Sequence, residues 1–440
     1  DYRSRTPGGV EVQRYYNSAG FFRFDAAPEK STDVWRTTWD RRLLAAPAGG
    51  NVLAYAQRPD GALQVFLPNG REMHNSQGGA AALLERLADA AGATTGWRLT
   101  SADTDVELYD DAGRVQSITL RAGQAYALAY DASGRLGTVT DAYGGALSFT
   151  YDASGRLSGF VAPGNRIYVY GYDAKGRLTS VTYPDGAVRS YHYENANFLH
   201  ALTGMTDENG QRFATWDYDS MGRAISSTHA GGAEAVTLYH GSFSTTANEG
   251  MTSVVDAFAT TRSYYYQVAG GMLRVKRVTQ PCPGCTGANA TYTYDANGNI
   301  ATYRDFNGNQ TSYVYDPTRN LEISRTEAYG TALARTITTQ WHPDHRLPTR
   351  ITAPSGAAGV DEVTDFVYDA RGNVLQKTIT AGGRMRQWKS TYSALGQLLT
   401  ADGPRTDVTD VTTYTYHASS DPCGACRGNV KSVANAPSTT

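Results

Sequence analysis

The stretch from Tyr130 to Leu157 reads YDASGRLGTVTDAYGGALSFTYDASGRL, and it contains the phrase Tyr-Asp-x-x-Gly-Arg-Leu twice. The phrase also starts at Tyr109, with Val115 in place of the leucine, and at Tyr172, so four copies follow one another at intervals of 21 residues. A fixed period of this size indicates a repeat architecture in which each unit packs on its neighbours. Such arrays usually build a surface or a container rather than a single catalytic pocket.

Each residue of the phrase has a predicted structural task. Asp-x-x-Gly is typical of a tight turn, because the aspartate accepts hydrogen bonds from the backbone just ahead and the glycine takes positive φ. Tyrosine is a strand former, so the phrase should join the end of one strand to the start of the next. Less regular copies continue towards the C-terminus. The tyrosine, aspartate and glycine positions that we predict to be structural are Tyr109, Asp110, Gly113, Tyr130, Asp131, Gly134, Tyr151, Asp152, Gly155, Tyr172, Asp173, Gly176, Tyr218, Asp219, Gly222, Tyr294, Asp295, Gly298, Tyr368, Asp369 and Gly372.

A second Asp-x-x-Gly turn lies about half a repeat after the first, as at 141–144 and 305–308. Two turns per repeat leave two strands of roughly six or seven residues, so the unit is an antiparallel hairpin and the chain a long β-meander. Leu178 and Val181 are three residues apart and cannot share one face of a regular strand, which predicts a β-bulge or strong twist there. The alanine-rich segment 80–91 has helical propensity, but its place in the repeat order favours a strand over 84–87.

Composition and charge exclude several classes of function. The formal net charge is −2, and the arginines are scattered about one per turn, so no basic stripe for nucleic acid is expected. No apolar stretch approaches the ~18 residues of a membrane-spanning helix. No serine-centred elbow or paired-histidine motif is found, so we predict no catalytic residue and no enzyme activity. We expect residues 1–100 to be a divergent leading part of the same sheet and 101–440 to be one repeat array, the whole being a fragment of a longer chain.

The four cysteines form two Cys-x-x-Cys pairs, Cys282 with Cys285 and Cys423 with Cys426. Two such pairs could supply a structural zinc site if the two turns meet in space. In an oxidising compartment they would instead form disulfides, within each pair or across the two. Both readings stay open from the sequence, and no other cofactor is expected.

The repeated phrase and its second glycine turn resemble the RHS/YD-repeat family, which comprises bacterial Rhs proteins, the C components of ABC toxins and the teneurins. The resemblance runs from about Tyr15 to the C-terminus, and Trp39-Asp40-Arg41-Arg42 resembles the opening of a bacterial Rhs core. It implies an all-β fold, in which a ribbon of hairpins spirals into a hollow shell around a polypeptide cargo.

The resemblance also implies a function and partners. The chain would be a structural wall segment of an Rhs-type cage, and its partners would be a C-terminal toxin as cargo and the remaining shell or secretion components. It would be secreted or lie at the surface of a bacterial cell. The self-cleavage motif and the toxin that this family carries at the end of the core are absent from the sequence. The alternative is an extracellular adhesion surface that binds carbohydrate.

Overall fold

The computed structural model describes residues 1–18, 34–47, 49–73, 82–279, 289–357 and 359–436. Within these ranges the chain is almost entirely β-structure, as expected, with one short 3₁₀ turn, η2 (Ala230–Gly232). The strands of the leading part are β1 (Tyr2–Arg3), β2 (Glu11–Val12), β3 (Arg14–Tyr16), β4 (Trp35–Thr37), β5 (Arg42–Ala45), β6 (Ala54–Gln57) and β7 (Leu63–Phe66).

The strands that follow are β8 (Leu83–Ala88), β9 (Thr94–Thr100), β10 (Val106–Asp110), β11 (Val115–Thr119), β12 (Ala125–Tyr130), β13 (Leu136–Asp141), β14 (Ala146–Tyr151), β15 (Leu157–Ala162), β16 (Arg166–Tyr172), β17 (Leu178–Thr182), β18 (Val188–His192), β19 (Gly204–Thr206), β20 (Arg212–Tyr218), β21 (Ala224–His229), β22 (Val236–His240) and β23 (Gly250–Val255). The remainder are β24 (Thr261–Ala269), β25 (Met272–Thr279), β26 (Asn289–Tyr294), β27 (Ile300–Arg304), β28 (Gln310–Tyr315), β29 (Glu322–Glu327), β30 (Arg335–Trp341), β31 (Pro348–Pro354), β32 (Asp361–Tyr368), β33 (Val374–Ala381), β34 (Arg384–Tyr392), β35 (Leu398–Asp402), β36 (Val411–Tyr416) and β37 (Val430–Asn435).

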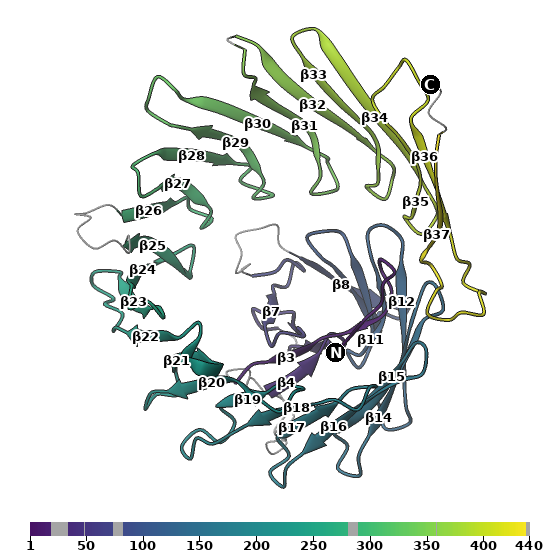
Figure 1. Ribbon diagram of the computed structural model, residues 1–440, viewed down its shortest axis with the longest axis vertical. Coiled ribbons are helices and arrows are strands. Elements are labelled where there is room, and N and C mark those ends of the chain that lie inside the picture. The colour runs from purple at the N-terminus through teal and green to yellow at the C-terminus, as the bar shows by residue number, and fades with distance from the viewer. Residues whose placement is uncertain (19–33, 48, 74–81, 280–288, 358, 437–440) are drawn as a thin grey trace.

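One long antiparallel sheet organises the described part of the chain. Its 30 strands, β8 to β37, pair in sequence order, so that every strand between the two ends bonds to the strand before it and the strand after it. Each phrase turn joins two neighbouring strands, so the array is the predicted meander of hairpins. Figure 1 shows the ribbon curving into a ring, with β12–β18 on one side and β26–β34 on the other. The all-β meander predicted from the repeat period and the spiral that the family resemblance implies are both confirmed.

The ribbon returns to its own beginning after one revolution. The Arg121 guanidinium donates a hydrogen bond to the carbonyl of Arg371 at 2.9 Å, across 250 residues. The Gln124 amide likewise donates to the carbonyl of Leu395 at 2.7 Å, across 271 residues. These contacts join turns of the first pass to turns of the last pass, and we call this line of contact the seam. The seam makes the ribbon a spiral with stacked passes rather than an open strip.

The leading segment, residues 1–73 as far as they are described, does not continue the ribbon. Its strands form three separate small sheets, β1–β2, β3–β4 and β5–β6–β7, which lie inside the ring of Figure 1. The expectation that these residues extend the same sheet was therefore wrong, although β8 and β9 do belong to the ribbon. The turn signals that supported it are local, and they cannot distinguish a hairpin in the wall from a hairpin packed on the wall. The division at residue 100 stays a prediction.

Two local predictions are confirmed. Residues 84–87 lie within strand β8, in place of the helix that alanine content alone favours. In β16–β17 the register shifts between Gly171 and Tyr172, and this bulge allows Leu178 and Val181 to face the same core, where they are 3% and 0% exposed. The same shift recurs at the tyrosine of each regular phrase, for example between Ala129 and Tyr130. The bulge is therefore part of the repeat.

Candidate functional site

The phrase turn at Tyr151 illustrates how each repeat is fastened. One oxygen of Asp152 accepts hydrogen bonds from the backbone N–H groups of Ser154 and Arg156, both at 2.9 Å. The other oxygen accepts from the Arg156 guanidinium at 2.6 Å. Gly155 lies at φ 79°, the left-handed region that the turn requires. The aspartate and glycine are thus turn-forming residues, as predicted for the whole series.

The phrase tyrosine links each repeat to the one before it. Tyr151 donates its hydroxyl hydrogen bond to the carbonyl of Leu136, 15 residues earlier, at 2.9 Å. The guanidinium of Arg135, from the preceding phrase, lies over the Tyr151 ring at 4.7 Å. The same hydroxyl-to-carbonyl bond recurs at Tyr130, Tyr172, Tyr218, Tyr294 and Tyr368. Tyr109 differs, because its hydroxyl bonds to Glu107.

Replacing Tyr151 with phenylalanine should weaken this link without disturbing packing. Loss of the bond to Leu136 should lower the free energy of unfolding by about 1 kcal/mol, the net value of one such hydrogen bond. Tyr239→Phe is the control, since that ring is 59% exposed and should change stability by less than ~0.5 kcal/mol. Denaturant unfolding measures both. Equal stability of the two variants would show that the inter-repeat bond contributes nothing.

Aromatic side chains hold the leading segment against the inner face of the ribbon. Trp35 packs on Tyr191 with ring centroids 4.7 Å apart, and its indole N–H donates to the Tyr193 hydroxyl at 2.7 Å. Trp39 packs edge-on against Tyr126 at 5.2 Å. Each of these tryptophans therefore meets a tyrosine of the wall. Contacts of this kind stabilise the docked leading segment through the apolar area that the rings bury and through their preferred ring–ring geometry.

A buried ion cluster sits in the same interface. Glu107, on β10, accepts hydrogen bonds from Arg58 at 2.7 and 2.8 Å and from Arg41, and it also bonds the Tyr109 hydroxyl. Burial alone would raise the pKa of Glu107, but the guanidinium groups of Arg58 and Arg41 outweigh it and hold the pKa at about 2. Burial and the neighbouring carboxylate raise the pKa of Tyr109. The cluster is an ionised carboxylate clamped between two cations, and it ties the leading segment to the wall.

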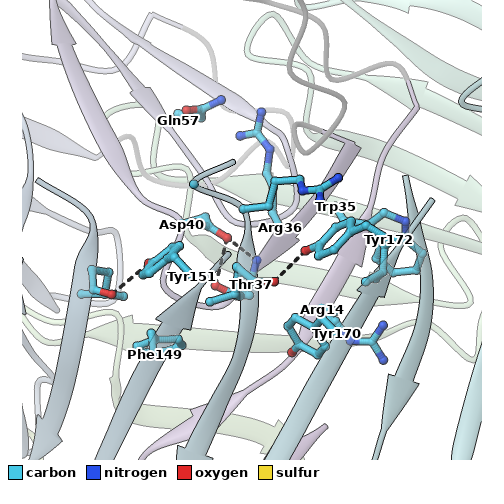
Figure 2. A pocket seen from close by; sticks show the side chains of 15 residues that line it. Arg14, Trp35, Arg36, Thr37, Asp40, Gln57, Phe149, Tyr151, Tyr170 and Tyr172 are labelled. Atoms are coloured by element: carbon cyan, nitrogen blue, oxygen red, sulfur yellow. Dashed lines mark hydrogen bonds between the residues drawn. The ribbon is translucent and has the colours of Figure 1, made fainter. Parts of the chain in front are cut away.

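A cavity of about 260 Å³ lies between β3–β4 of the leading segment and β13–β17 of the wall. Figure 2 shows Asp40, Thr37 and Trp35 facing Tyr151 and Tyr172 across it. Burial raises the pKa of Tyr172 to about 12, so this phenol stays neutral. The Asp40 carboxylate accepts hydrogen bonds from the backbone N–H and the hydroxyl of Thr37. Both of these hydrogen bonds lie within the leading segment, and the cavity separates that segment from the wall.

The inner face continues beyond the leading segment. Cross-strand pairs show which residues share this face. Starting at Tyr191, on which the leading segment packs, Tyr191 pairs with Met205, and Met205 pairs with Ala214. Farther along, the same face passes from Thr252 to Tyr264. From β24 to β28 it carries a series of half-buried aromatic residues. They are Tyr264, Tyr292, Tyr303 and Tyr313.

This uncovered aromatic face has its own hollow. A depression of about 580 Å³ is lined by three phrase aromatics, Tyr294, Tyr315 and Trp341. Tyr292 stacks against Tyr303 at 4.9 Å. On the covered side, tryptophans of the leading segment pack on equivalent wall tyrosines. Among the described residues, no aromatic side chain of the leading segment packs on the inner surface of β22–β37, and we call this surface the uncovered inner face.

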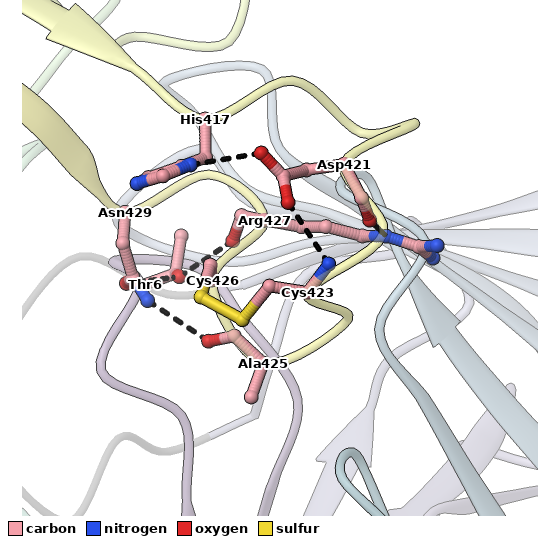
Figure 3. The surroundings of a disulfide bond; sticks show 8 residues. All are labelled: Thr6, His417, Asp421, Cys423, Ala425, Cys426, Arg427 and Asn429. Atoms are coloured by element: carbon pink, nitrogen blue, oxygen red, sulfur yellow. Dashed lines mark hydrogen bonds and ion pairs between the residues drawn. A yellow bond between two sulfur atoms is a disulfide. The ribbon is translucent and has the colours of Figure 1, made fainter.

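The second cysteine pair forms a disulfide between Cys423 and Cys426. Figure 3 shows it in the turn between β36 and β37, beside Thr6 of the leading segment. Cys282 and Cys285 lie outside the described residues, so their pairing stays open. The four-cysteine zinc site and a disulfide across the two pairs are both wrong for Cys423 and Cys426, because these two sulfurs are bonded to each other and are not thiolate ligands. Among the residues that the structure describes, no group of three or more metal-ligating side chains is found.

Sequence reasoning identified the turn residues but missed Glu107, Arg58 and the tryptophans as docking groups. One signal was present: in Val106-Glu107-Leu108-Tyr109 the glutamate alternates with the phrase tyrosine and so lies on its face of the strand. A carboxylate on that buried face needs a cation nearby. The sequence does not indicate which arginine supplies it, since Arg41 and Arg58 are 66 and 49 residues away.

The fold and its inner face define a class of protein, namely a hollow wall of β-hairpin repeats with a leading segment packed inside. Residues 81–245 match the Teneurin YD-shell family, and residues 294–332 match the RHS repeat. The resemblance to the RHS/YD-repeat family that the Tyr-Asp phrase predicted is confirmed over these residues.

One solved structure supports the fold, and a second is a weaker match. The structure described as TcdB2-TccC3-Cdc42 is similar with a TM-score of 0.52 at 13% identity, over 88% of this chain and 26% of that one. TcdB2-TccC3 without its hypervariable C-terminal region matches over 92% of this chain and 22% of that one, at 13% identity and a TM-score of 0.36. The chain thus spans about a quarter of the structures it matches. No curated protein matches its sequence.

Across the described ranges, no helix is long and apolar enough to cross a membrane.

Proposed function

We propose that this chain is a structural wall segment of an Rhs-type shell that encloses a polypeptide cargo, namely a toxin C-terminal to the shell, for secretion or delivery. One observation carries the proposal: the inner face that binds the leading segment continues, uncovered and rich in aromatic residues, over β22–β37. A wall needs such a face towards its contents, and it needs fixed contacts between its own repeats. The phrase residues supply the fixed contacts, so the proposed role is mechanical and requires no catalytic residue.

The chemistry of the uncovered inner face supports a polypeptide as cargo. Tyrosine rings offer apolar area and a polar tip, so they accept many side chains without selecting one. The leading segment illustrates this mode of contact, because Trp35 uses both its ring and its N–H on wall tyrosines. The partners on this account are the cargo and the other shell or secretion components. The proposed location is outside a bacterial cell or at its surface.

The test is the intact mass of the polypeptide as its host makes it, measured under non-reducing conditions after mild denaturation. The proposal expects a mass well above the 47.5 kDa of this chain, or a large shell with a smaller retained piece. Limited proteolysis should digest that smaller piece only after the shell is denatured. A mass near 47.5 kDa with no retained piece would reject enclosure of a cargo from the same chain.

A second candidate is an adhesion surface that binds carbohydrate, and one feature favours it. A groove of about 430 Å³ is lined by Tyr168 and Tyr183 together with Arg166, Asp185 and Glu208. Aromatic rings beside charged groups suit a sugar. Binding of a glycan panel by the isolated chain, abolished by Tyr183→Ala, would favour this function over enclosure.

A further inference from the structure

The turn between β36 and β37 is held by a dense set of internal bonds. The Cys423–Cys426 disulfide closes its tip, and the backbone N–H of Cys426 also donates to the carbonyl of Cys423 at 2.8 Å. The Asn429 amide donates to the carbonyl of Ala425, between the two cysteines, at 2.9 Å. The disulfide and Asn429 therefore belong to one small structure (Figure 3).

The residues directly after Cys426 reach three other parts of the protein. The Thr6 hydroxyl lies 2.9 Å from the carbonyl oxygen of Arg427 and 2.6 Å from the side-chain oxygen of Asn429. The Arg427 guanidinium donates to the carbonyl of Gly144, on the first pass, at 3.3 Å. The carbonyl of Gly428 accepts from the Gln397 amide at 3.0 Å. One turn thus joins the leading segment, the first pass and the last pass.

The contact at Gly428 is tight as well as polar. This glycine has φ 72°, and a Cβ added there would stand 2.5 Å from the Tyr143 ring and 2.7 Å from a methyl carbon of Thr6. Such close packing depends on where the backbone of residues 427–429 is held. Reduction of the disulfide would release Cys426, two residues before Gly428. The backbone of residues 427–429 could then move, and its contacts would loosen together.

We propose that the Cys423–Cys426 disulfide is a reducible fastener of the seam, open to thiol–disulfide exchange with a small-molecule thiol. Cys423 is exposed, whereas Cys426 is half-buried, so an attacking thiol reaches the Cys423 sulfur first. The attacking thiolate forms a mixed disulfide with the Cys423 sulfur, and the Cys426 sulfur leaves as a thiolate and takes up a proton. A second thiol then attacks the mixed disulfide and frees Cys423. In sum, two thiols are oxidised to one disulfide and the protein disulfide is reduced to two thiols.

The test is hydrogen–deuterium exchange of the folded chain before and after treatment with dithiothreitol, which supplies both thiols. The expected result is exchange about tenfold faster in residues 425–429 and 4–10, with β14–β16 unchanged. A Cys282→Ser/Cys285→Ser variant is the matched control and should respond like the original chain. A Cys423→Ser/Cys426→Ser variant should exchange fast without reductant. If that variant does not fold, reduction of the folded original chain still decides the question.

Two results would overturn the proposal. One is unchanged exchange at residues 425–429 and 4–10 after mass spectrometry has shown both Cys423 and Cys426 reduced. The other is a peptide map of the untreated protein in which Cys423 and Cys426 are free thiols or are bonded to other cysteines.

Discussion

Glu107→Gln should release the leading segment from the wall and lower the free energy of unfolding by about 3–5 kcal/mol, the usual cost of removing one partner from a buried ion pair. The carboxylate is 4% exposed and is the shared partner of Arg41 and Arg58. Glutamine keeps the size but leaves two guanidinium groups facing a neutral amide. Denaturant unfolding measures the loss, and hydrogen exchange in β5 (Arg42–Ala45) reports the release.

Glu85→Gln is the control for this substitution. Its ion pair with Arg98 is 3.8 Å long, with both side chains 49% exposed, so the expected change is below ~0.5 kcal/mol. If the two variants unfold at the same denaturant concentration, the Glu107 cluster does not hold the leading segment in place.

The same carboxylate gives a pH dependence with a defined sign. The pKa of Glu107 is about 2 in the folded protein against an ordinary 4.5, so the folded state favours the ionised form. Its contribution is complete above about pH 4.5 and is lost as the pH falls towards 2, amounting to about 3 kcal/mol. Between about pH 5 and pH 3 the original chain should lose more stability than Glu107→Gln. Parallel losses in the two proteins would contradict the clamped-carboxylate account.

Gly113→Ala should disrupt the docking of the leading segment far more than the equivalent change two motifs along the wall, at Gly155. Gly113 and Gly155 occupy the same place in the phrase, at φ 76° and 79°. A Cβ at Gly113 would collide with the backbone of Leu43, whose N–H donates to the Gly113 carbonyl at 2.9 Å. At Gly155 no atom lies within 4 Å of the added Cβ.

Both substitutions place alanine in the left-handed backbone region, which lowers the free energy of unfolding by about 1–2 kcal/mol. Gly113→Ala adds overpacking against fixed backbone, worth about 1–3 kcal/mol more. The difference between their unfolding free energies therefore isolates the docking contact from turn strain. Equal destabilisation would show that the leading segment does not rest on this turn.

The sequence predicted the features that local chemistry decides. The period of the Tyr-Asp phrase predicted the hairpins, and the spacing of Leu178 and Val181 predicted a bulge that proves to recur at the tyrosine of each regular phrase. Asp-x-x-Gly predicted turns whose hydrogen bonds span only two to four residues, as at Asp152.

The features that were missed depend on contacts between distant residues. The seam joins groups such as Gln124 and Leu395, 271 residues apart, and no local pattern encodes that meeting. The leading segment has the same turns as the wall, so its place inside the spiral follows from tertiary contacts, such as the packing of Trp35 and Trp39 and the bonds of Glu107. The disulfide at Cys423 could be named as an alternative from the spacing, but its position on the seam could not.

On the proposed function, the uncovered inner face of the ribbon faces an enclosed polypeptide. A photo-crosslinking amino acid placed at Tyr292, on the inner face, and separately at Thr293, on the opposite face, tests it in the polypeptide as its host makes it. The account predicts that position 292 captures peptides from outside residues 1–440 and that position 293 captures none of them. Equal capture at both positions, or capture from position 293 alone, would contradict it.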